Sequence, residues 1–280
     1  MKLPIPTLFL AVAATALQAA TAEENLFRGG GRVRGSKRGS KGDKNSDDKE
    51  PRSLGGFGPY GICTDTYPTL DLSQAYQPLN VPEQVYPDED GVTRVQMIFG
   101  LAHYKGASFD TILRVHDAVA PGKTIHAVPG GRIELELINC LREPLGFNGP
   151  EAKNKFHIPN STNIHTHGPH ISGASPGDNV FLNLGPGNSS NYVYEFNENH
   201  MPGTFWYHPH LHGSSALQVG QGAAGMLIVD HPKDYEIPDA IMDMPEHQMV
   251  FQHLSLDLLR DASTISDDEV TNWVDQNFNM

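Results

Sequence analysis

The chain has 280 residues, of which 38% are hydrophobic, so it is long enough to bury one or two cores. Its 2 cysteines are too few for a disulfide framework, although Cys63 and Cys140 could pair in an exported protein. A formal net charge of -13 argues against nucleic acid as the main partner, because phosphate binding needs Lys and Arg concentrated on a folded surface.

The N-terminus has the layout of a secretory signal. Lys2 precedes an apolar run from Leu8 to Ala20, and small residues follow as far as Ala22. The run is shorter than the roughly 20 apolar residues that span a membrane, and no later segment is apolar enough to do so. We therefore expect residues 1–22 to be a signal peptide, the protein to be secreted or kept in the secretory pathway, and no part of it to span a membrane.

Residues 23–78 are expected to form a disordered basic linker. From Arg28 to Arg52 the chain is rich in Gly, Ser and charged residues, and such a segment cannot bury enough apolar surface to fold by itself. A polyanion-binding arm and a propeptide cleaved near Lys37 are the alternatives, and a solvated linker is the simpler interpretation for an exported chain.

Residues 79–232 have the pattern of an all-β domain, in which short strands alternate with turn residues. Residues 132–138 place apolar side chains on one face and two glutamates on the other, and residues 191–196 repeat this alternation with aromatic side chains. The wholly apolar run 225–229 is typical of a central strand buried on both sides. Together with residues 94–99, these segments predict one Greek-key β-sandwich.

Residues 233–280 are expected to be a connector followed by the start of a second domain. Residues 249–254 resemble an opening strand, and Ser266–Asp275 begins with a capping-box pattern that predicts a short helix. No complete second sandwich follows in the sequence, so we expect this domain to be incomplete.

Two groups of closely spaced histidines are the most informative feature of the sequence. One contains His165 and His167, and the other contains His208, His210 and His212. Residues two apart on a strand share a face, so each His-x-His pair projects two imidazoles into one space. If the two segments lie side by side, four imidazoles converge, and such a set suits copper, zinc, iron or nickel.

Other known histidine motifs do not match this pattern. Cupins place a glutamate soon after His-x-His, and none follows His167 closely. Metallo-β-lactamases need His-x-His-x-Asp-His, whereas Leu211 and His212 occupy the last two of those positions. Chance spacing among 14 histidines is a poor explanation for two groups that each end in glycine. Seven histidines without this spacing are assigned to structure or surface, namely His126, His157, His170, His200, His231, His247 and His253.

Residues 165–168 and 203–213 resemble the first two copper motifs of the multicopper oxidases. The resemblance extends over residues 121–230, because the turn at 129–131 and the apolar strand at 221–230 also match the family's pattern. It implies a laccase-like N-terminal domain of the cupredoxin (plastocyanin-like) fold. Thr166 stands where many members have tryptophan, at a position that is not a ligand.

The resemblance also implies a role for each matched residue. His165 would bind the type 2 copper, and the type 3 copper pair would be bound by His167, His208 and His210. Asp178 resembles the family's acid near this trinuclear cluster, which helps to deliver protons to reduced oxygen. A simple turn aspartate after Pro-Gly is the alternative for this residue. Trp206 and Tyr207 are expected to be packing residues beside the ligands.

The function implied by the resemblance is the reduction of oxygen to water while a phenol, an amine or a metal ion is oxidised. Electrons enter such enzymes at a type 1 copper held by a cysteine between histidines, and neither Cys63 nor Cys140 has histidine neighbours. We therefore expect this chain to supply half of the trinuclear site and to be inactive without further cupredoxin domains, in cis or in trans. A non-catalytic, secreted copper-binding or copper-carrying protein is the alternative, and a tetrahedral zinc site is a further one.

Overall fold

The computed structural model describes Cys63 and residues 68–72, 81–106, 109–142, 158–232 and 235–253. The expected signal peptide, the expected linker up to residue 62 and the expected helix at Ser266–Asp275 lie outside the described residues. No helix in the described part of the chain is long and apolar enough to cross a membrane.

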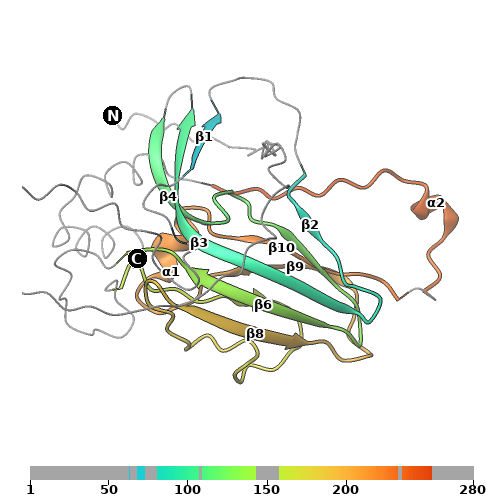
Figure 1. Cartoon of the computed structure of the whole chain (residues 1–280). Coiled ribbons are helices and arrows are strands. Elements are labelled where there is room, and N and C mark those ends of the chain that lie inside the picture. The colour runs from blue at the N-terminus through green and yellow to red at the C-terminus, as the bar shows by residue number, and fades with distance from the viewer. Residues whose placement is uncertain are drawn as a thin grey trace, which may run out of the picture. The chain divides into compact units, whose positions relative to one another are not determined.

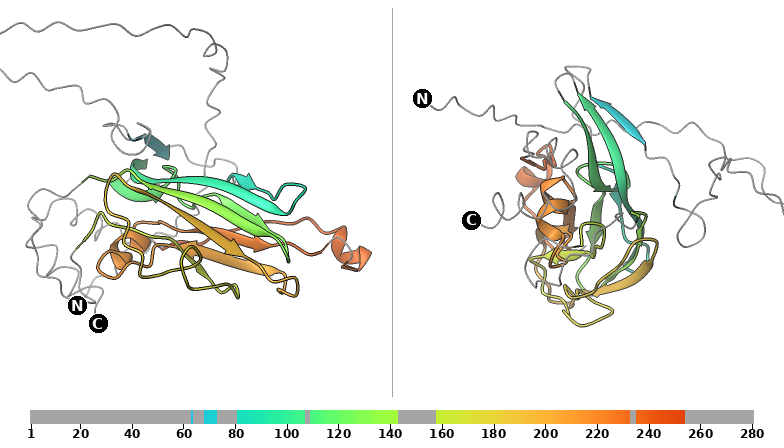
Figure 2. Two further views of the ribbon diagram at one scale, coloured as in Figure 1. Left: turned by 60° about the horizontal axis from the view of Figure 1, so that its bottom comes forward. Right: turned by 90° about the vertical axis from the view of Figure 1, so that its left-hand side faces the viewer.

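The described residues form two β-sheets that pack as two layers (Figures 1 and 2). The first sheet has the strand order β1-β3-β6-β8, with β4 paired to β3, and the second has the order β2-β5-β10-β9-β7. The predicted all-β sandwich is therefore confirmed. The elements are β1 (Thr69–Leu72), β2 (Gln84–Val85), β3 (Val92–Gly106), β4 (Asp110–His116), β5 (Thr124–Ala127), β6 (Arg132–Asn139), β7 (His165–His167), β8 (Ser189–Glu195), β9 (Gly203–His208), α1 (Ser215–Gly220), β10 (Gly225–Val229) and α2 (Asp239–Met242).

The alternation of apolar and polar residues decides which side of the first sheet faces the core. Leu135 on β6 lies opposite Val95 on β3 and Tyr192 on β8, and all three side chains are buried. These residues pack in one cluster with apolar residues of the second sheet, among them Ile125 and Leu227. Burial of each such side chain contributes about 1.5–3 kcal/mol, so this cluster holds the two layers together.

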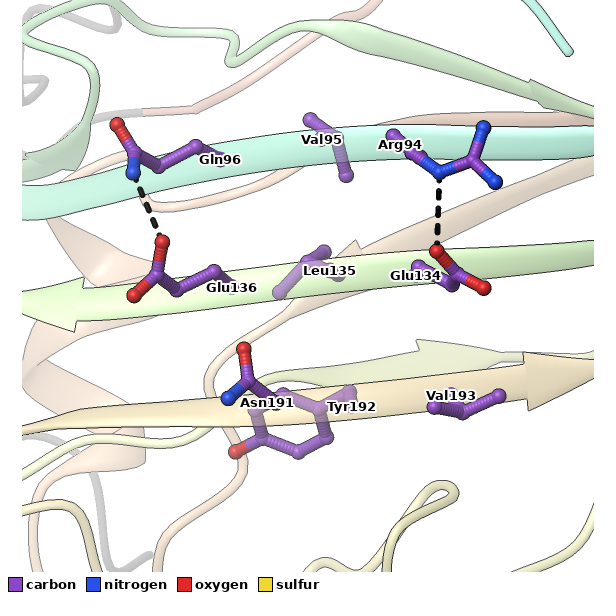
Figure 3. A pocket seen from close by; sticks show the side chains of 9 residues that line it. All are labelled: Arg94, Val95, Gln96, Glu134, Leu135, Glu136, Asn191, Tyr192 and Val193. Atoms are coloured by element: carbon purple, nitrogen blue, oxygen red, sulfur yellow. Dashed lines mark hydrogen bonds and ion pairs between the residues drawn. The ribbon is translucent and has the colours of Figure 1, made fainter. Parts of the chain in front are cut away.

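The outward-facing residues of the same strands are polar. Across β3 and β6, Arg94 donates a hydrogen bond to Glu134 at 3.1 Å, and Gln96 donates one to Glu136 at 2.8 Å (Figure 3). These side chains and Asn191 line a shallow hollow on the sheet. Exposed pairs of this kind contribute about 0–1 kcal/mol each, and the hollow contains no histidine or cysteine that could hold a metal.

The edge strand of the first sheet differs from what the sequence predicted. The linker expected over residues 23–78 is wrong at its C-terminal end, because Thr69–Leu72 forms β1 and pairs in parallel with β3. Leu70 packs against a second apolar cluster that includes Tyr104, which gives this short strand a buried contact. Cys63 is joined to Cys140 immediately after β6, so the disulfide that the sequence left open is formed.

The segment that follows β10 has no strand in its described part. The strand expected at residues 249–254 is not formed over 249–253, where only Gln252 makes a β-bridge. The side chain of Gln252 donates a hydrogen bond to the Gly222 carbonyl at 3.1 Å. Met249 and Phe251 are exposed.

Tyr207 anchors the strand that carries the second histidine group. Its side chain is 1% exposed, and its hydroxyl donates a hydrogen bond to the Lys123 carbonyl at 2.8 Å. Gly225 lies opposite it on β10, and a Cβ atom at Gly225 would overlap the Tyr207 ring. The glycine therefore leaves the space that Tyr207 occupies, and His208 follows directly at the end of β9.

His116, the last residue of β4, is a fully buried histidine in this core. Neither of its ring nitrogens has a hydrogen-bond partner within the described part of the chain. The ring packs at centroid distances of 5.1 Å from Phe99 and 5.6 Å from Tyr207. Burial, with a smaller contribution from His208, lowers the pKa of His116 to about 3, so the ring is neutral in the folded protein at neutral pH.

Replacing Cys63 and Cys140 with serine should lower the free energy of unfolding by about 2–5 kcal/mol, because the disulfide links residues separated by 77 positions. Urea unfolding at neutral pH measures this change. The serine variant should be insensitive to dithiothreitol, whereas the native protein should lose the same stability when it is reduced. Equal stability of the oxidised native protein and the serine variant would contradict the role of this bond.

The substitution His116→Leu should make the protein more stable and less sensitive to acid. The folded-state pKa of about 3 lies below the unfolded-state value of about 6.5, so stability is complete above about pH 6.5 and falls as the pH decreases towards 3. Leucine should remove this loss, which is up to about 1.4 kcal/mol per pH unit. It should also raise the free energy of unfolding at neutral pH by about 1–3 kcal/mol, because two unpaired nitrogens leave the core.

Urea unfolding of the metal-free protein between about pH 7 and pH 5 tests this prediction. His231→Leu is the control, because His231 is exposed and its replacement should leave the pH slope unchanged. The same pH slope in His116→Leu and in the native protein would mean that another group causes the acid sensitivity.

Candidate metal centre

The two histidine segments lie side by side as β7 and β9, at one edge of the second sheet. The antiparallel register places His165 opposite His208 and His167 opposite Trp206. Because side chains alternate along a strand, these four side chains lie on one face of the strand pair. Tyr207 and Thr166 lie on the opposite face and are buried.

Three of the four predicted ligands form a compact group. One ring nitrogen from each of His165, His167 and His208 lies within 4.8 Å of the others. Nδ1 of His167 and Nε2 of His208 are 3.5 Å apart, a separation that allows both to bind one ion through bonds of about 2 Å. Nδ1 of His208 lies 2.9 Å from the Pro209 carbonyl oxygen and therefore carries the proton, which leaves its Nε2 as the free lone pair.

His210 lies next to this group but is not part of it. Its ring centroid is 4.9 Å from that of His165 and 5.8 Å from that of His208. Its Nδ1 is buried and has no hydrogen-bond partner among the described residues, so the nitrogen is available to a ligand. The structure thus brings all four histidine rings together, with three ring nitrogens already converged and the fourth ring beside them.

Asp178 contacts the first of these histidines. Its Oδ2 accepts a hydrogen bond from Nδ1 of His165 at 2.7 Å, and its Oδ1 accepts one from the backbone N–H of Thr166 at 3.0 Å. Its side chain is 10% exposed. With the His165 proton held on Nδ1, Nε2 of that ring is free to bind a metal, and a carboxylate behind a metal-binding histidine fixes both the tautomer and the ring orientation.

The protein environment favours the neutral form of two of these imidazoles, His208 and His210. The pKa of His208 is lowered to about 4, mainly by burial; the Pro209 carbonyl opposes this shift and the charges of the neighbouring histidines add to it. Burial is also the main cause that lowers the pKa of His210. Neutral imidazoles offer their lone pairs to a cation without competition from protons, so the site can bind a metal at neutral pH.

Asn163 holds the two histidine segments together, and the sequence analysis did not identify it. Its side chain is fully buried and donates hydrogen bonds to the carbonyls of Val180 at 2.8 Å and Leu182 at 3.1 Å. Its Oδ1 accepts the backbone N–H of His210 at 2.7 Å. The only signal in the sequence is an asparagine two positions before His165, which does not reveal these distant partners.

Two histidines that were assigned to structural roles have both ring nitrogens engaged by the protein. The Nδ1 of His126 pairs with Asp230 at 2.9 Å, and its Nε2 lies 2.9 Å from the side-chain oxygen of Gln84. His200 donates from Nδ1 to the Met201 carbonyl and accepts the backbone N–H of His170 at Nε2. Neither ring has a free nitrogen for a metal, in contrast to the rings on β7 and β9.

Comparison with known proteins identifies residues 151–234 as a match to the multicopper oxidase family model. Laccase-1 of Pleurotus ostreatus is 41% identical over 156 residues, which are 55% of this chain and 25% of that protein. The multicopper oxidase mco of Staphylococcus epidermidis is 28% identical over 117 residues, which are 42% of this chain and 22% of that protein. The crystal structure of a multi-copper oxidase from Pediococcus acidilactici covers 68% of this chain and 36% of its own, at 19% identity and a TM-score of 0.47.

The match therefore concerns one part of a longer kind of protein. The chain spans about a quarter or less of the length of these curated relatives. The region matched by the family model contains both histidine segments and Asp178. Residues 151–234 of this chain thus match the multicopper oxidase family, and this match implies copper as the cofactor of the region.

Proposed function

We propose that the chain supplies part of a trinuclear copper site at which oxygen is reduced to water. The observation that carries this proposal is the convergence of three imidazole nitrogens within 4.8 Å, contributed by two paired strands. A set of imidazoles without thiolate or carboxylate ligands suits copper. Family membership favours copper over zinc for the same four histidines.

The ligands in this proposal follow the matched motifs. His165 binds the type 2 copper through Nε2, because its Nδ1 is held by Asp178. His167, His208 and His210 bind the type 3 pair, and the facing nitrogens of His167 and His208 support this assignment. Copper ions held by these residues would supply the redox chemistry, the transfer of electrons to oxygen.

Asp178 acts on this site through His165. Its carboxylate keeps the His165 proton on Nδ1 and aims Nε2 at the metal, so it is a positioning residue in this geometry. The family resemblance adds a second role, the delivery of protons to reduced oxygen, and the low exposure of the carboxylate beside the ligands is compatible with it. This second role is part of the proposal.

The remaining parts of the reaction lie with other cupredoxin domains, in cis or in trans. The reducing substrate would be a phenol, an amine or a metal ion, and those domains would hold the type 1 copper at which electrons enter. This assignment rests on the family, whose matched members are several times longer than the region of similarity.

A non-catalytic copper-binding function is the second candidate. It is favoured by the fact that three ligand nitrogens converge within this chain by itself, without a partner. Electron paramagnetic resonance during Cu(II) titration, first of the isolated chain and then of the chain with partner cupredoxin domains, separates the two functions. Stoichiometric binding of a single isolated copper favours a carrier, whereas a coupled, signal-silent pair that forms only with the partner domains favours the oxidase.

Replacing His165 or His208 with alanine should weaken Cu(II) binding by the isolated chain at least about tenfold, because each contributes one of the three converged nitrogens. Competition with a chelator of known affinity measures the change. His231→Ala is the control, since this exposed histidine stacks on Tyr235 and lies outside both histidine segments. Loss of affinity in the control alone, or in none of the variants, would refute the assigned site.

The substitution Asp178→Asn should weaken Cu(II) binding by about 10–100-fold, because asparagine cannot hold the His165 proton on Nδ1 in the same way. Asp230→Asn is a matched control, since Asp230 holds Nδ1 of His126 at 2.9 Å and that histidine is not a proposed ligand. Both variants are compared by chelator competition and by urea unfolding without metal. Equal copper affinity in Asp178→Asn and native protein would remove Asp178 from the site.

A further inference from the structure

Trp206 lies on the metal-binding face of β9, where the histidine side chains also lie. Its indole stacks on the His208 imidazole with a centroid distance of 4.2 Å and an interplanar angle of 26°. It also stacks on the His167 imidazole at 4.9 Å and 23°. One indole thus contacts two proposed ligands that come from two different strands.

The position of Trp206 argues against a role in core packing. The core-facing residues of β9 are Phe205 and Tyr207, which pack in the cluster between the sheets. Trp206 points the other way and is 39% exposed, although it is one of the largest apolar side chains in the chain. The packing role expected from the sequence is therefore incomplete, because the contacts of this side chain are with histidines.

The His167 ring depends on this contact more than the other rings do. Within the described part of the chain, the only hydrogen-bond partner of the His167 ring is Nε2 of His208. His165 is held by Asp178, and His208 is held by the Pro209 carbonyl. An unrestrained ring loses rotamer freedom when it binds a metal, at a cost of about 0.5–1.5 kcal/mol, and prior ordering by a neighbour reduces this cost.

We propose that Trp206 is a positioning residue of the metal centre, which holds the rings of His167 and His208 so that Nδ1 of the first faces Nε2 of the second. This inference rests on the proposed copper function, because it concerns the same histidines. It assigns to the exposed tryptophan the part that Asp178 plays for His165. The indole does this by stacking on two rings at once, whereas the carboxylate does it by a hydrogen bond to one ring.

The test compares Trp206→Ala, Trp206→Phe and native chain for Cu(II) affinity, the electron paramagnetic resonance spectrum of bound Cu(II), and thermal unfolding without metal. The alanine variant should bind Cu(II) about tenfold more weakly, with an altered spectrum. Phenylalanine should restore most of the affinity, because it can stack on the same rings. Tyr86→Ala is a matched control, since Tyr86 is 60% exposed and stacks at 4.2 Å on His126, which is not a proposed ligand.

The outcomes separate this inference from the proposed function. Failure of the native chain to bind Cu(II) would overturn the proposed function itself. Native binding with an unchanged affinity and spectrum in Trp206→Ala would overturn only the positioning role. A loss of affinity that phenylalanine does not restore, or that accompanies an equal loss in Tyr86→Ala, would assign Trp206 to general stability and would also overturn the inference.

A separate observation concerns the two Asn-x-Ser/Thr tripeptides of the chain, which begin at Asn160 and Asn188. Asn160 is engaged by the protein, because its Oδ1 accepts hydrogen bonds from Nε of Arg114 at 3.0 Å and from Nη2 at 2.8 Å. Its Nδ2 donates to the Arg142 carbonyl. Asn188 is exposed in the turn before β8, and its Nδ2 contacts only the carbonyls of its own turn, Gly185 at 3.3 Å and Pro186 at 3.1 Å.

We infer that Asn188, and not Asn160, carries an N-linked glycan when the chain is exported through a eukaryotic secretory pathway. The transfer forms a bond between Nδ2 and C1 of a sugar, breaks the C1–O bond of a lipid pyrophosphate-linked oligosaccharide, and releases the lipid pyrophosphate and the amide proton. A glycan at Asn160 would displace the contacts to Arg114 and Arg142, whereas one at Asn188 would project into solvent.

Secretion of the full chain from a eukaryotic host, followed by peptide mass spectrometry after glycosidase treatment in H₂¹⁸O, tests this inference. The Asn188 peptide should carry the ¹⁸O label of a former glycan, and the mass step of the intact protein should vanish in Asn188→Gln but persist in Asn160→Gln. An unlabelled Asn188 peptide in secreted protein, or equal labelling at Asn160, would overturn it.

Discussion

In the pairing of β7 with β9, His165 lies opposite His208 and His167 lies opposite Trp206, and the candidate metal centre depends on this register. A shift of one residue would turn each histidine of one strand to the opposite face, because side chains alternate with a period of 2. The buried faces of both strands prevent this shift. Tyr207 fills a space that Gly225 leaves open and is hydrogen-bonded to the Lys123 carbonyl, so a slipped strand would expose the tyrosine and bury a histidine.

The site is built on the edge of a sandwich whose stability lies elsewhere. The apolar cluster between the sheets holds the layers together, and the disulfide ties Cys63 to the end of β6. The histidines lie on the face of the second sheet that points away from this cluster. His116 lies between the core and the site. Its ring packs against Tyr207, and His208 contributes to the lowering of its pKa.

Three of the four proposed ligands are each held by a different kind of hydrogen bond. A carboxylate orients His165, a backbone carbonyl orients His208, and Asn163 holds the backbone of His210. Burial lowers the pKa of His208 and of His210, which favours their neutral, metal-binding form. Converged imidazole nitrogens without hydrogen-bond partners cost free energy, and a bound cation would offset this cost. For this reason the geometry supports a metal site better than a structural histidine cluster. In the proposed function, further cupredoxin domains complete the copper coordination and supply the electrons.

Much of this could be predicted from the sequence, because alternation along a strand is a local property. The two-residue spacing within each histidine pair was sufficient to predict that both side chains of the pair lie on one face; the pairs are His165 with His167 and His208 with His210. The apolar alternation of residues 132–138 and 191–196 was sufficient to predict the β-sandwich that the structure confirms. Contacts between distant segments were not available from the sequence. The strand at Thr69–Leu72, the partners of Asn163, the stacking of Trp206 and the contact of Asp178 with His165 join positions that only the folded chain brings together. Local pattern determines which way a side chain faces, whereas its neighbours are decided by the pairing and packing of strands that the sequence does not place relative to one another.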